Sequence, residues 1–579
     1  MTTARVPRWR RLLTHEWSLA ALGAILIALF LNADALADPS HTLPSDIWDP
    51  SLLAYTIAWG GYALRHDPGG LWDLNAFYPA PYGLAYSDAL LGYAPFALVG
   101  TGPEAAILRY NLIFIGAHAL VLFGGYVLAR QLGLRPGPAA LAGVALAVAP
   151  WRLAQTGHLQ VLSSGGMFLA LAMLARGHGI RWLRAEGEPV PPVRPGWALA
   201  GWLVATWQIS LGFGLGVPFL YVLLGCVLVG VFLWARRHRG AWAHALAPRL
   251  LVADTAGGVI LAAVALLMAQ PYLKVLELYP YARRTAATVA LYSPPPSGLF
   301  TAPPQSTVWG DLQSQLRDGL SGEKMLLPGL VLCMLAAAGL FLSVWPRRVR
   351  IGLGVGTIVL ALLCLGTNGP AGGHLGYLAL LSLPGFEAIR TPGRLIVWVT
   401  LCLALLAGGA VGALVPWARQ VVGAWLRGRH PRLRSALTQA IVTVPTLLVF
   451  IEGLGTVTHA PMPPAPPSLS TAPAPYLVLP MHAVMDMNIM LWSTDRFADT
   501  VNGGSGFIPA EWARVNEAVA TFPDESSIDY LRAIGVRSVV VLPFRAWQEP
   551  LASAATIPID GLGVTREVHP DAVVFTLDP

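Results

Sequence analysis

The sequence predicts an all-α polytopic transmembrane bundle of about eleven helices, followed by a small C-terminal α/β domain. Composition, the length of the apolar runs and the placement of arginine predict this fold. Of the 579 residues, 55% are hydrophobic and 12% are charged, which is about half the charged fraction of a soluble domain. This composition excludes a disordered chain and argues against a soluble cytosolic enzyme.

The apolar runs give the number of helices, because a membrane-spanning helix needs about 17–25 apolar residues. We expect the first run to be a span and not a signal peptide, since it lacks a small-residue cleavage site and many runs follow it. The eleven runs lie at about 17–37, 104–129, 137–151, 159–175, 195–211, 215–235, 250–270, 325–345, 351–366, 395–416 and 437–456.

Arginine is concentrated in every second loop between these runs. The N-terminal segment is basic, and so are the loops near Arg135, Arg181, Arg237, Arg348 and Arg429. The positive-inside rule therefore places the N-terminus in the cytoplasm, and an odd number of spans places the C-terminal domain outside it. We expect a multi-pass protein of the bacterial inner (cytoplasmic) membrane. The net charge of +7 then reflects contact with the lipid bilayer, and no nucleic-acid partner is expected.

Composition divides the chain into three parts. Residues 1–456 form the transmembrane domain, 457–475 form a Pro-rich linker that we expect to be stiff, and 476–579 form the extracytoplasmic domain. In the last part, alternating strand and helix patterns predict an α/β fold. These patterns lie at 476–480, 527–534, 535–542 and 572–577. The outer loops of the transmembrane domain lie at 38–103, 271–324 and 366–394.

The four cysteines all lie inside apolar runs. They are Cys226, Cys333, Cys364 and Cys402. We interpret them as packing residues, so neither a disulfide nor a metal cluster is expected.

Acidic residues are concentrated in the first outer loop. Asp46 and Asp49 precede a segment in which Leu52, Tyr55 and Trp59 recur at three- and four-residue steps. This spacing predicts an amphipathic helix on the bilayer surface, with Asp49 and a proline at its N-terminus. Asp49 is then either a helix cap or a carboxylate at the membrane face that acts as a general base.

The same loop continues with Asp73, Asn75 and Tyr78. Aromatic rings and carboxylates fixed in a Pro-rich loop suit sugar binding, because a ring contacts the C–H face of a sugar and a carboxylate contacts its hydroxyls. An interfacial aromatic belt explains the aromatic residues equally well. Both interpretations stay open on the sequence.

The next outer loop contains Arg152 and His158. A lone histidine at a helix start is either structural or able to contact or orient a phosphate, and the neighbouring arginine favours an anion. It is not a zinc site, because no second His or Cys stands at ligand spacing.

Four further arginines lie in outer loops, where the positive-inside rule does not expect them. Arg283 and Arg284 lie in one loop, and Arg390 and Arg394 flank Thr-Pro-Gly just before a span. Arginine holds phosphate with several donors and keeps its charge at physiological pH. We predict that these residues bind an anionic substrate, with contact to lipid headgroups or snorkelling as the alternative.

Short motifs of this chain resemble those of a known superfamily. They are Trp48-Asp49-Pro-Ser-Leu, Phe77-Tyr-Pro, Gly157-His158-Leu-Gln160 and Leu383-Pro-Gly-Phe with Arg390-Thr-Pro-Gly-Arg394. Together they resemble the GT-C glycosyltransferases, and within them the YfhO-like bacterial multi-pass proteins. The Gly-rich Val501-Asn-Gly-Gly-Ser-Gly and the stretch from Leu531 to Val541 resemble the tail domain of the same proteins.

The resemblance implies an inverting transfer of a sugar from a polyprenyl-phosphate donor to a glycan, lipid or protein acceptor. It also implies an acidic general base in the first outer loop, a position that Asp49 matches and for which Asp46 is the rival. Arg390 and Arg394 would stabilise the departing phosphate, aided by Arg283 or His158. A lipid phosphate is a competent leaving group, so no cofactor is obligatory, although a divalent metal is compatible with the chemistry.

Two other functions are compatible with the sequence. A transporter or flippase for a lipid-linked substrate predicts ionisable residues buried in the membrane, and the runs offer mainly Asp254 and Glu452, each near an end. A non-catalytic envelope-assembly protein predicts that function survives loss of the outer-loop carboxylates.

Overall fold

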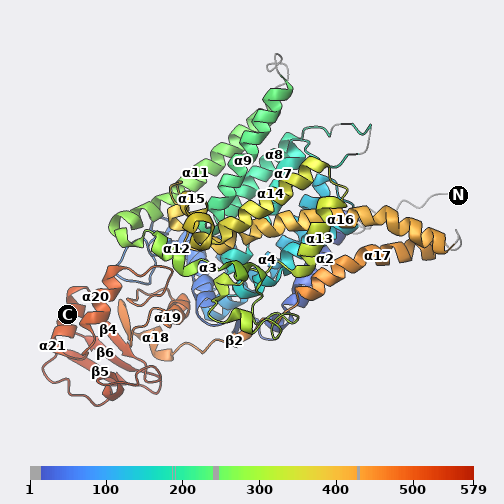
Figure 1. Cartoon of the computed structure of the whole chain (residues 1–579). Helices are drawn as coiled ribbons and strands as arrows, with labels where there is room; N and C mark the ends of the chain where they lie inside the picture. The colour runs from blue at the N-terminus through green and yellow to red at the C-terminus, as the bar shows by residue number, and fades with distance from the viewer. Residues whose placement is uncertain (1–14, 185–186, 190, 239–246, 427–430, 579) are drawn as a thin grey trace, which may run out of the picture. The chain divides into compact units, whose positions relative to one another are not determined.

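The computed structural model describes residues 15–184, 187–189, 191–238, 247–426 and 431–578 (Figure 1). Contacts within the chain define two compact units. The helical unit comprises Met1–Ala33, Phe114–Ala265 and Arg284–Val457, and the mixed unit comprises Asp34–Ile113, Leu266–Arg283 and Thr458–Pro579. Among the arginines used to predict topology, several lie outside the described residues. They are Arg5, Arg8, Arg10, Arg11, Arg239, Arg427 and Arg429.

The helical unit contains a helix at every predicted apolar run that falls within it. Its helices are α2 (Glu16–Leu31), α5 (Pro136–Val148), α6 (Leu159–Leu162), α7 (Gly165–Gly177), α8 (Pro195–Ile209), α9 (Phe213–Arg237), α12 (Ala286–Tyr292), α13 (Leu330–Phe341), α14 (Arg347–Cys364), α15 (Tyr377–Leu380), α16 (Ile396–Trp425) and α17 (Pro431–Glu452). Helices α4 (Pro103–Leu132) and α11 (Pro248–Leu278) have residues in both units.

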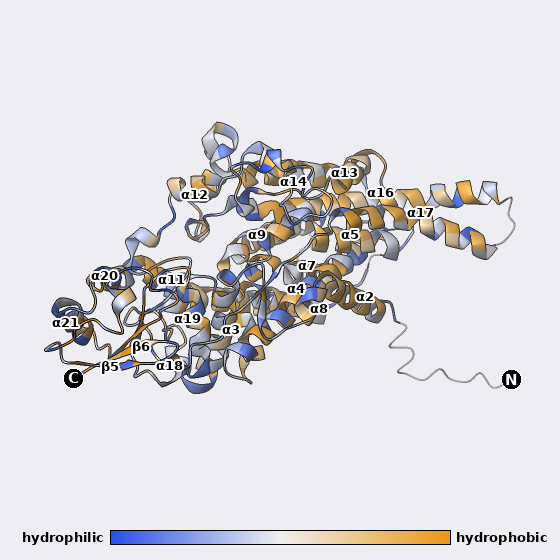
Figure 2. Cartoon of the chain, turned by 90° about the horizontal axis from the view of Figure 1, so that it is seen from below, coloured by the Kyte–Doolittle hydropathy of each residue, from blue (hydrophilic) through white to orange (hydrophobic). Residues whose placement is uncertain are grey.

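In the described part of the chain, seven helical segments are long and apolar enough to cross a membrane. The runs at 17–37 and 325–345 form helices of only 16 and 12 residues, and α14 begins with three arginines. The mainly helical fold and its membrane character are therefore confirmed, while the count of eleven spans stays a prediction. Figure 2 shows α2, α16 and α17 as mostly hydrophobic along their length.

Helix α16 is the centre of the helical unit. Its residues from Ile396 to Val411 are nearly all buried, and it packs against α5, α13, α14 and α17. Gly339 of α13 faces the carbonyl of Leu406 so closely that a β-carbon there would collide with it. The small residue thus lets two helix backbones approach, which is how apolar helices associate without a hydrophobic driving force.

The mixed unit contains a four-stranded sheet in the order β3-β4-β6-β5. Strand β3 (Tyr476–Leu479) runs parallel to β4 (Ser538–Val541), whereas β6 (Val573–Leu577) is antiparallel to both β4 and β5 (Val564–Val568). Strands β3, β4 and β6 lie where the sequence predicts strands. The remaining helices of this unit are α3 (Asp49–His66), α18 (Pro467–Thr471), α19 (Asp486–Trp492), α20 (Ala510–Ala518) and α21 (Glu525–Ala533).

The Pro-rich segment 457–475 makes regular contacts inside the mixed unit. Its strand β2 (His459–Pro461) pairs antiparallel with β1 (Thr42–Pro44) of the first loop. The N–H and hydroxyl of Ser468 in α18 both donate hydrogen bonds of 2.8 Å to Asp571. The segment is thus held near its start and at its middle, and the domain boundaries stated above stay a prediction.

Helix α3 differs from the amphipathic surface helix predicted to begin at Asp49 and Pro50. From Pro50 to Gly61 every residue is buried, on all faces of the helix. The reason is that α19 and the turn Leu91–Ala97 cover the face expected to be open. The pattern of Leu52, Tyr55 and Trp59 identified one buried face, and small residues such as Ser51 and Gly60 allow the other faces to be covered.

Candidate functional site

A cluster of polar side chains lies where three 3-10 turns of the helical unit meet. Arg394 comes from the turn Pro392–Leu395, Glu323 from Gly322–Lys324 and Gln155 from Pro150–Gln155. Arg394 Nη2 donates a hydrogen bond of 2.6 Å to Glu323 Oε1, and Gln155 Nε2 donates one of 3.2 Å to Glu323 Oε2. We call these residues, with the nearby His158, the Glu323 cluster.

The Glu323 carboxylate is enclosed, with only 13% of its side chain exposed. Burial raises the pKa of Glu323, but the charge of Arg394, followed by that of His158, lowers it more, so that the pKa lies below its ordinary value. Glu323 is therefore ionised at neutral pH. It orients the Arg394 guanidinium and offsets part of the positive charge around it.

The sequence before α16 explains how Arg394 reaches Glu323. Pro392 takes the first position of its turn, where a missing N–H costs nothing. A β-carbon on Gly393 would lie 2.8 Å from the carbonyl oxygen of Glu323. Glycine at this position therefore lets the two turns touch.

Arg152, predicted to contact a phosphate, is enclosed instead and is 3% exposed. Its Nη2 donates a hydrogen bond of 3.1 Å to the Leu162 carbonyl, and its guanidinium lies 5.5 Å from the centre of the Trp151 ring. These contacts fasten the turn Pro150–Gln155 to the end of α6. The observed surroundings of Arg152 are structural, and we leave it out of the proposed phosphate site.

Arg284 and Arg390 form a second basic group in the helical unit. The Arg390 guanidinium lies 4.9 Å from the centre of the Tyr292 ring, and the Arg284 N–H donates a hydrogen bond of 3.2 Å to the Glu387 carbonyl. Burial lowers the pKa of Arg284, and the charge of Arg390 lowers it further. The two positive charges of this group thus lie within electrostatic range of each other. Arg283, the neighbouring residue, belongs to the mixed unit.

Arg394 also lines an apolar cavity in the helical unit. Other residues of its wall are Leu215, Pro218, Phe386, Ile389 and Trp398. The cavity measures about 10 Å³, which holds about one water molecule. A cation and an apolar lining therefore meet at one place, in a space that only side-chain movement can enlarge.

The two candidate bases, both in the mixed unit, differ in their surroundings. Asp46 Oδ1 accepts a hydrogen bond of 2.8 Å from the Trp48 N–H, and Oδ2 accepts one of 3.1 Å from the Ser45 hydroxyl. Asp49 is the first residue inside α3 and not its cap, which is Trp48. The buried Tyr110 lies within electrostatic range of both carboxylates. Because Asp46 accepts hydrogen bonds from Ser45 and Trp48, it stabilises the turn before the helix.

The predicted sugar-binding residues hold the mixed unit together. Asp73 accepts a hydrogen bond of 2.7 Å from the backbone of Tyr82. Asn75 is 3% exposed and accepts a hydrogen bond of 2.8 Å from the Tyr55 hydroxyl, while its amide donates to Ser493 and Ala498. The side chain of Tyr78 packs against the hydrophobic core of the mixed unit. These three therefore position the loop, and we do not keep Asn75 as a substrate contact.

An aromatic group in the mixed unit was not among the predicted site residues. The Phe507 ring, from the Gly-rich loop, has its centre 5.2 Å from that of Tyr86 and 5.3 Å from those of Tyr279 and Tyr281. Glu511 accepts a hydrogen bond of 2.8 Å from the Tyr279 hydroxyl. Tyr281 is 60% exposed, so aromatic surface and a carboxylate lie together at a position open to a ligand.

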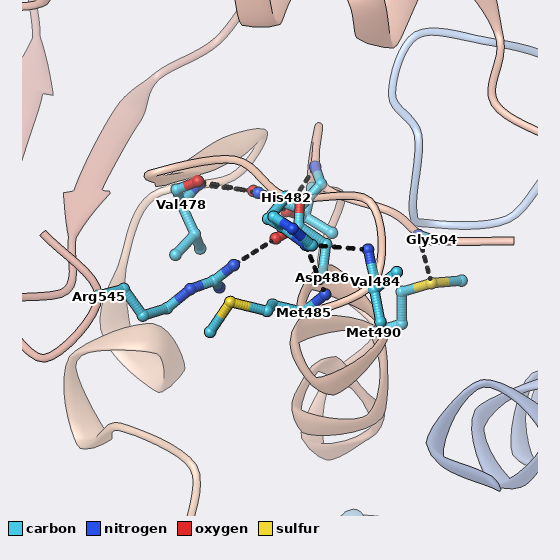
Figure 3. Close-up of polar contacts among 10 residues, drawn as sticks. Val478, His482, Val484, Met485, Asp486, Met490, Gly504 and Arg545 are labelled. Carbon is cyan, nitrogen blue, oxygen red and sulfur yellow. Dashed lines mark hydrogen bonds and ion pairs between the residues drawn. The ribbon is translucent and has the colours of Figure 1, made fainter. Parts of the chain in front are cut away.

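A buried ion pair in the mixed unit was also missed (Figure 3). Arg545 Nη2 donates a hydrogen bond of 2.8 Å to Asp486 Oδ1, and Asn502 donates one of 3.0 Å to Oδ2. Asp486 is fully buried. Burial raises the pKa of Asp486 to about 6, although the charge of Arg545 lowers it. The pair joins the start of α19 to the segment after β4.

The two ionisable residues predicted near span ends are held by local partners. Asp254 is 3.0 Å from His178 Nε2 and accepts a hydrogen bond of 3.0 Å from the Trp202 indole. Glu452 accepts hydrogen bonds from the backbone N–H groups of Leu330 and Val331, which begin α13. These contacts are those of packing and helix capping, so they do not favour a transporter.

No family model matches the sequence, and no curated protein matches it. A solved structure does share its fold. With the arabinofuranosyltransferase AftD from Mycobacteria the TM-score is 0.52 at 16% identity, over 100% of this chain and 40% of that one. The chain therefore shares the fold of this arabinofuranosyltransferase. It spans less than half the length of AftD, and the YfhO-like subtype stays a prediction.

Two further solved structures give lower scores. The oligosaccharyltransferase AglB from Archaeoglobus fulgidus, solved with an inhibitory peptide and a dolichol-phosphate, gives a TM-score of 0.45 at 13% identity, over 90% of this chain and 69% of that one. ArnT from Cupriavidus metallidurans, bound to undecaprenyl phosphate, gives 0.40 at 14% identity, over 97% and 99%. These scores add nothing to the fold assignment.

Proposed function

We propose that the protein is a membrane glycosyltransferase that moves a sugar from a polyprenyl-phosphate donor to a hydroxyl group of a cell-envelope acceptor. The reaction takes place on the extracytoplasmic face and inverts the configuration at the anomeric carbon. One observation carries the proposal: Arg394 pairs with an ionised carboxylate and also lines an apolar cavity. A cation in the wall of an apolar space suits a ligand with a phosphate head and a hydrocarbon chain.

Arg394 holds the donor phosphate, and Glu323 fixes the direction of its guanidinium. His158 is a further polar group of the Glu323 cluster, and the pair of Arg284 and Arg390 adds positive charge in the same unit. This charge stabilises the phosphate as it departs, because the interaction strengthens while negative charge develops on the leaving oxygen. The cavity beside Arg394 has to widen before a prenyl chain can enter it.

Asp49 acts as the general base of the proposed reaction. Its carboxylate takes the proton from the acceptor hydroxyl, the oxygen bonds to the anomeric carbon, and the bond from that carbon to the phosphate oxygen breaks. The products are the glycosylated acceptor and free polyprenyl phosphate. Asp46 is the rival candidate, and its two oxygens accept hydrogen bonds from Ser45 and Trp48.

The acceptor is proposed to bind at the aromatic group around Phe507. Tyr281 offers an exposed ring, and Glu511 offers a carboxylate to hydroxyl groups. This arrangement favours a glycan acceptor over a lipid or a protein.

The proposal is tested by measuring release of free polyprenyl phosphate from a panel of polyprenyl-phosphate sugars. The full chain is purified in detergent and supplied with envelope glycans as acceptors. Release by the wild type and by Asp46→Asn, but not by Asp49→Asn, is the expected result. Equal release by Asp49→Asn would remove Asp49 as the base, and absence of release from every donor, with or without acceptor, would contradict the transferase.

A further inference from the structure

A second cavity in the helical unit lies far along α16 from the Glu323 cluster. It is formed by the start of α5, the C-terminal half of α16 and the N-terminal half of α17, and it measures about 460 Å³, within the range of ligand sites. Three arginines line it, Arg135, Arg419 and Arg434. We call it the basic cavity.

The arginines of the basic cavity have no carboxylate near them in sequence. No Asp or Glu stands between Glu104 and Glu186 or between Glu387 and Glu452. Arg434 Nη2 instead donates a hydrogen bond of 3.4 Å to the Arg419 carbonyl. Three positive charges around one space repel each other, and an anion bound among them offsets this repulsion.

The rest of the wall is partly apolar. Pro138, Val415 and Val442 line the cavity beside the arginines, with Thr438 and Gln439 as neutral donors. A soluble anion gains no binding energy from such apolar groups. The glycerol and upper acyl chain of a lipid gain it by burying apolar surface against them.

The surface of α16 near the cavity has the composition of a membrane boundary. Trp417 and Trp425 are 54% and 73% exposed, and Val421 between them is also exposed. Tryptophan and arginine together mark the depth of lipid headgroups. Helices α16 and α17, which lie side by side in Figure 1, therefore carry the cavity at that depth.

We propose that the basic cavity binds the phosphate of an anionic phospholipid such as phosphatidylglycerol or cardiolipin. The arginines bind the phosphodiester with charge-assisted hydrogen bonds, and the apolar wall receives the glycerol end of the chains. This site is separate from the donor site proposed above and does not depend on transferase activity.

The test is native mass spectrometry of the full chain, purified in a neutral detergent and titrated with phosphatidylglycerol or with phosphatidylcholine. The variant Arg135→Gln/Arg419→Gln/Arg434→Gln is compared with Arg236→Gln/Arg237→Gln/Arg249→Gln. The second set removes the same charge from exposed ends of α9 and α11. We expect the first set to weaken the tightest phosphatidylglycerol binding by at least about tenfold, and the second set to leave it unchanged.

Three outcomes would overturn the proposal. Equal weakening of phosphatidylglycerol binding by the two sets would mean non-specific attraction. Tight binding of phosphatidylcholine would mean that binding does not depend on the charge of the lipid. Displacement of the lipid by inorganic phosphate at equal concentration would identify a soluble phosphate as the ligand. If the triple variant does not run as a single folded species, Arg434→Gln alone, at an exposed position, is tested with the same expectation of direction.

Discussion

Glu323 and Arg394 are 71 residues apart in sequence and form an ion pair of 2.6 Å in the helical unit. A mostly buried pair adds little net stability, yet loss of one partner is costly because the other charge stays enclosed. The pair therefore fixes a guanidinium at the start of the central helix α16, where a rigid element supports it.

Substitution of Arg394 by Gln should have two separable effects. The enclosed Glu323 loses its counter-charge, so we expect a loss of about 3 kcal/mol in stability, together with weaker donor binding. The double variant Arg394→Gln/Glu323→Gln should regain most of the stability but none of the donor affinity. Thermal unfolding and binding of a polyprenyl phosphate measure the two effects. Recovery of both by the double variant would remove Arg394 from the donor site.

The Glu323 cluster should make stability depend on pH in the acid range. Because the folded pKa of Glu323 lies below its ordinary value of 4.5, its contribution is present above pH 4.5 and is lost as the pH falls below it. The difference in unfolding temperature between the wild type and Glu323→Gln should therefore shrink on acidification. A difference that stays constant from neutral to acid pH would show that Glu323 does not titrate as described.

Asp49 and Asp46 should respond differently to the same substitution. Asp49→Asn should lower transfer by about 10²–10⁴-fold, the range for loss of a general base. Asp46→Asn keeps an oxygen that accepts the Trp48 N–H, so its rate should stay within a few-fold of the wild type. Initial rates with one active donor compare the two. The reverse order would assign the base to Asp46.

The buried pair of Asp486 and Arg545 should be needed for stability of the mixed unit. Arg545→Met leaves an enclosed carboxylate, and we expect a loss of about 3–5 kcal/mol. Arg514→Met breaks the ion pair with Glu511. Because the Arg514 side chain is 62% exposed, the loss in stability should be under about 1 kcal/mol. Protease resistance of the C-terminal segment compares them. Equal sensitivity of the two variants would contradict the distinction.

Metal removal should leave the reaction intact. A phosphate leaves without a metal when positive side chains neutralise its charge, which Arg394 is proposed to do. Rates before and after dialysis against EDTA test this. A loss that magnesium restores would place a cation in the donor site.

The helices were predictable because apolar composition over about 20 residues is enough to identify a membrane helix. Helix α3 was placed correctly but its burial was not, since the segments that cover it come from elsewhere in the chain. The spacing of Leu52, Tyr55 and Trp59 cannot reveal that α19 packs on the opposite face.

The candidate site was predicted in part. Arg394 stood out as a positive charge on the wrong side of a span, a signal within a single loop. Glu323 was missed because its role depends on a partner 71 residues away. Nothing in the sequence next to it distinguishes it from any other acidic residue in a polar loop. The aromatic group around Phe507 was missed for the same reason, since its rings come from three separate segments.

The pairing of β1 with β2 joins the first loop to the segment that follows α17. Ser51 of α3 contacts Met462, 411 residues further on, and Asn75 binds residues later still. At about 5–20 residues per second of synthesis, the loop with Asp49 waits on the order of tens of seconds for the strand and helix that bury it. The unit that carries the proposed base is therefore completed last, so a chain released early has its spans but not its carboxylate in place.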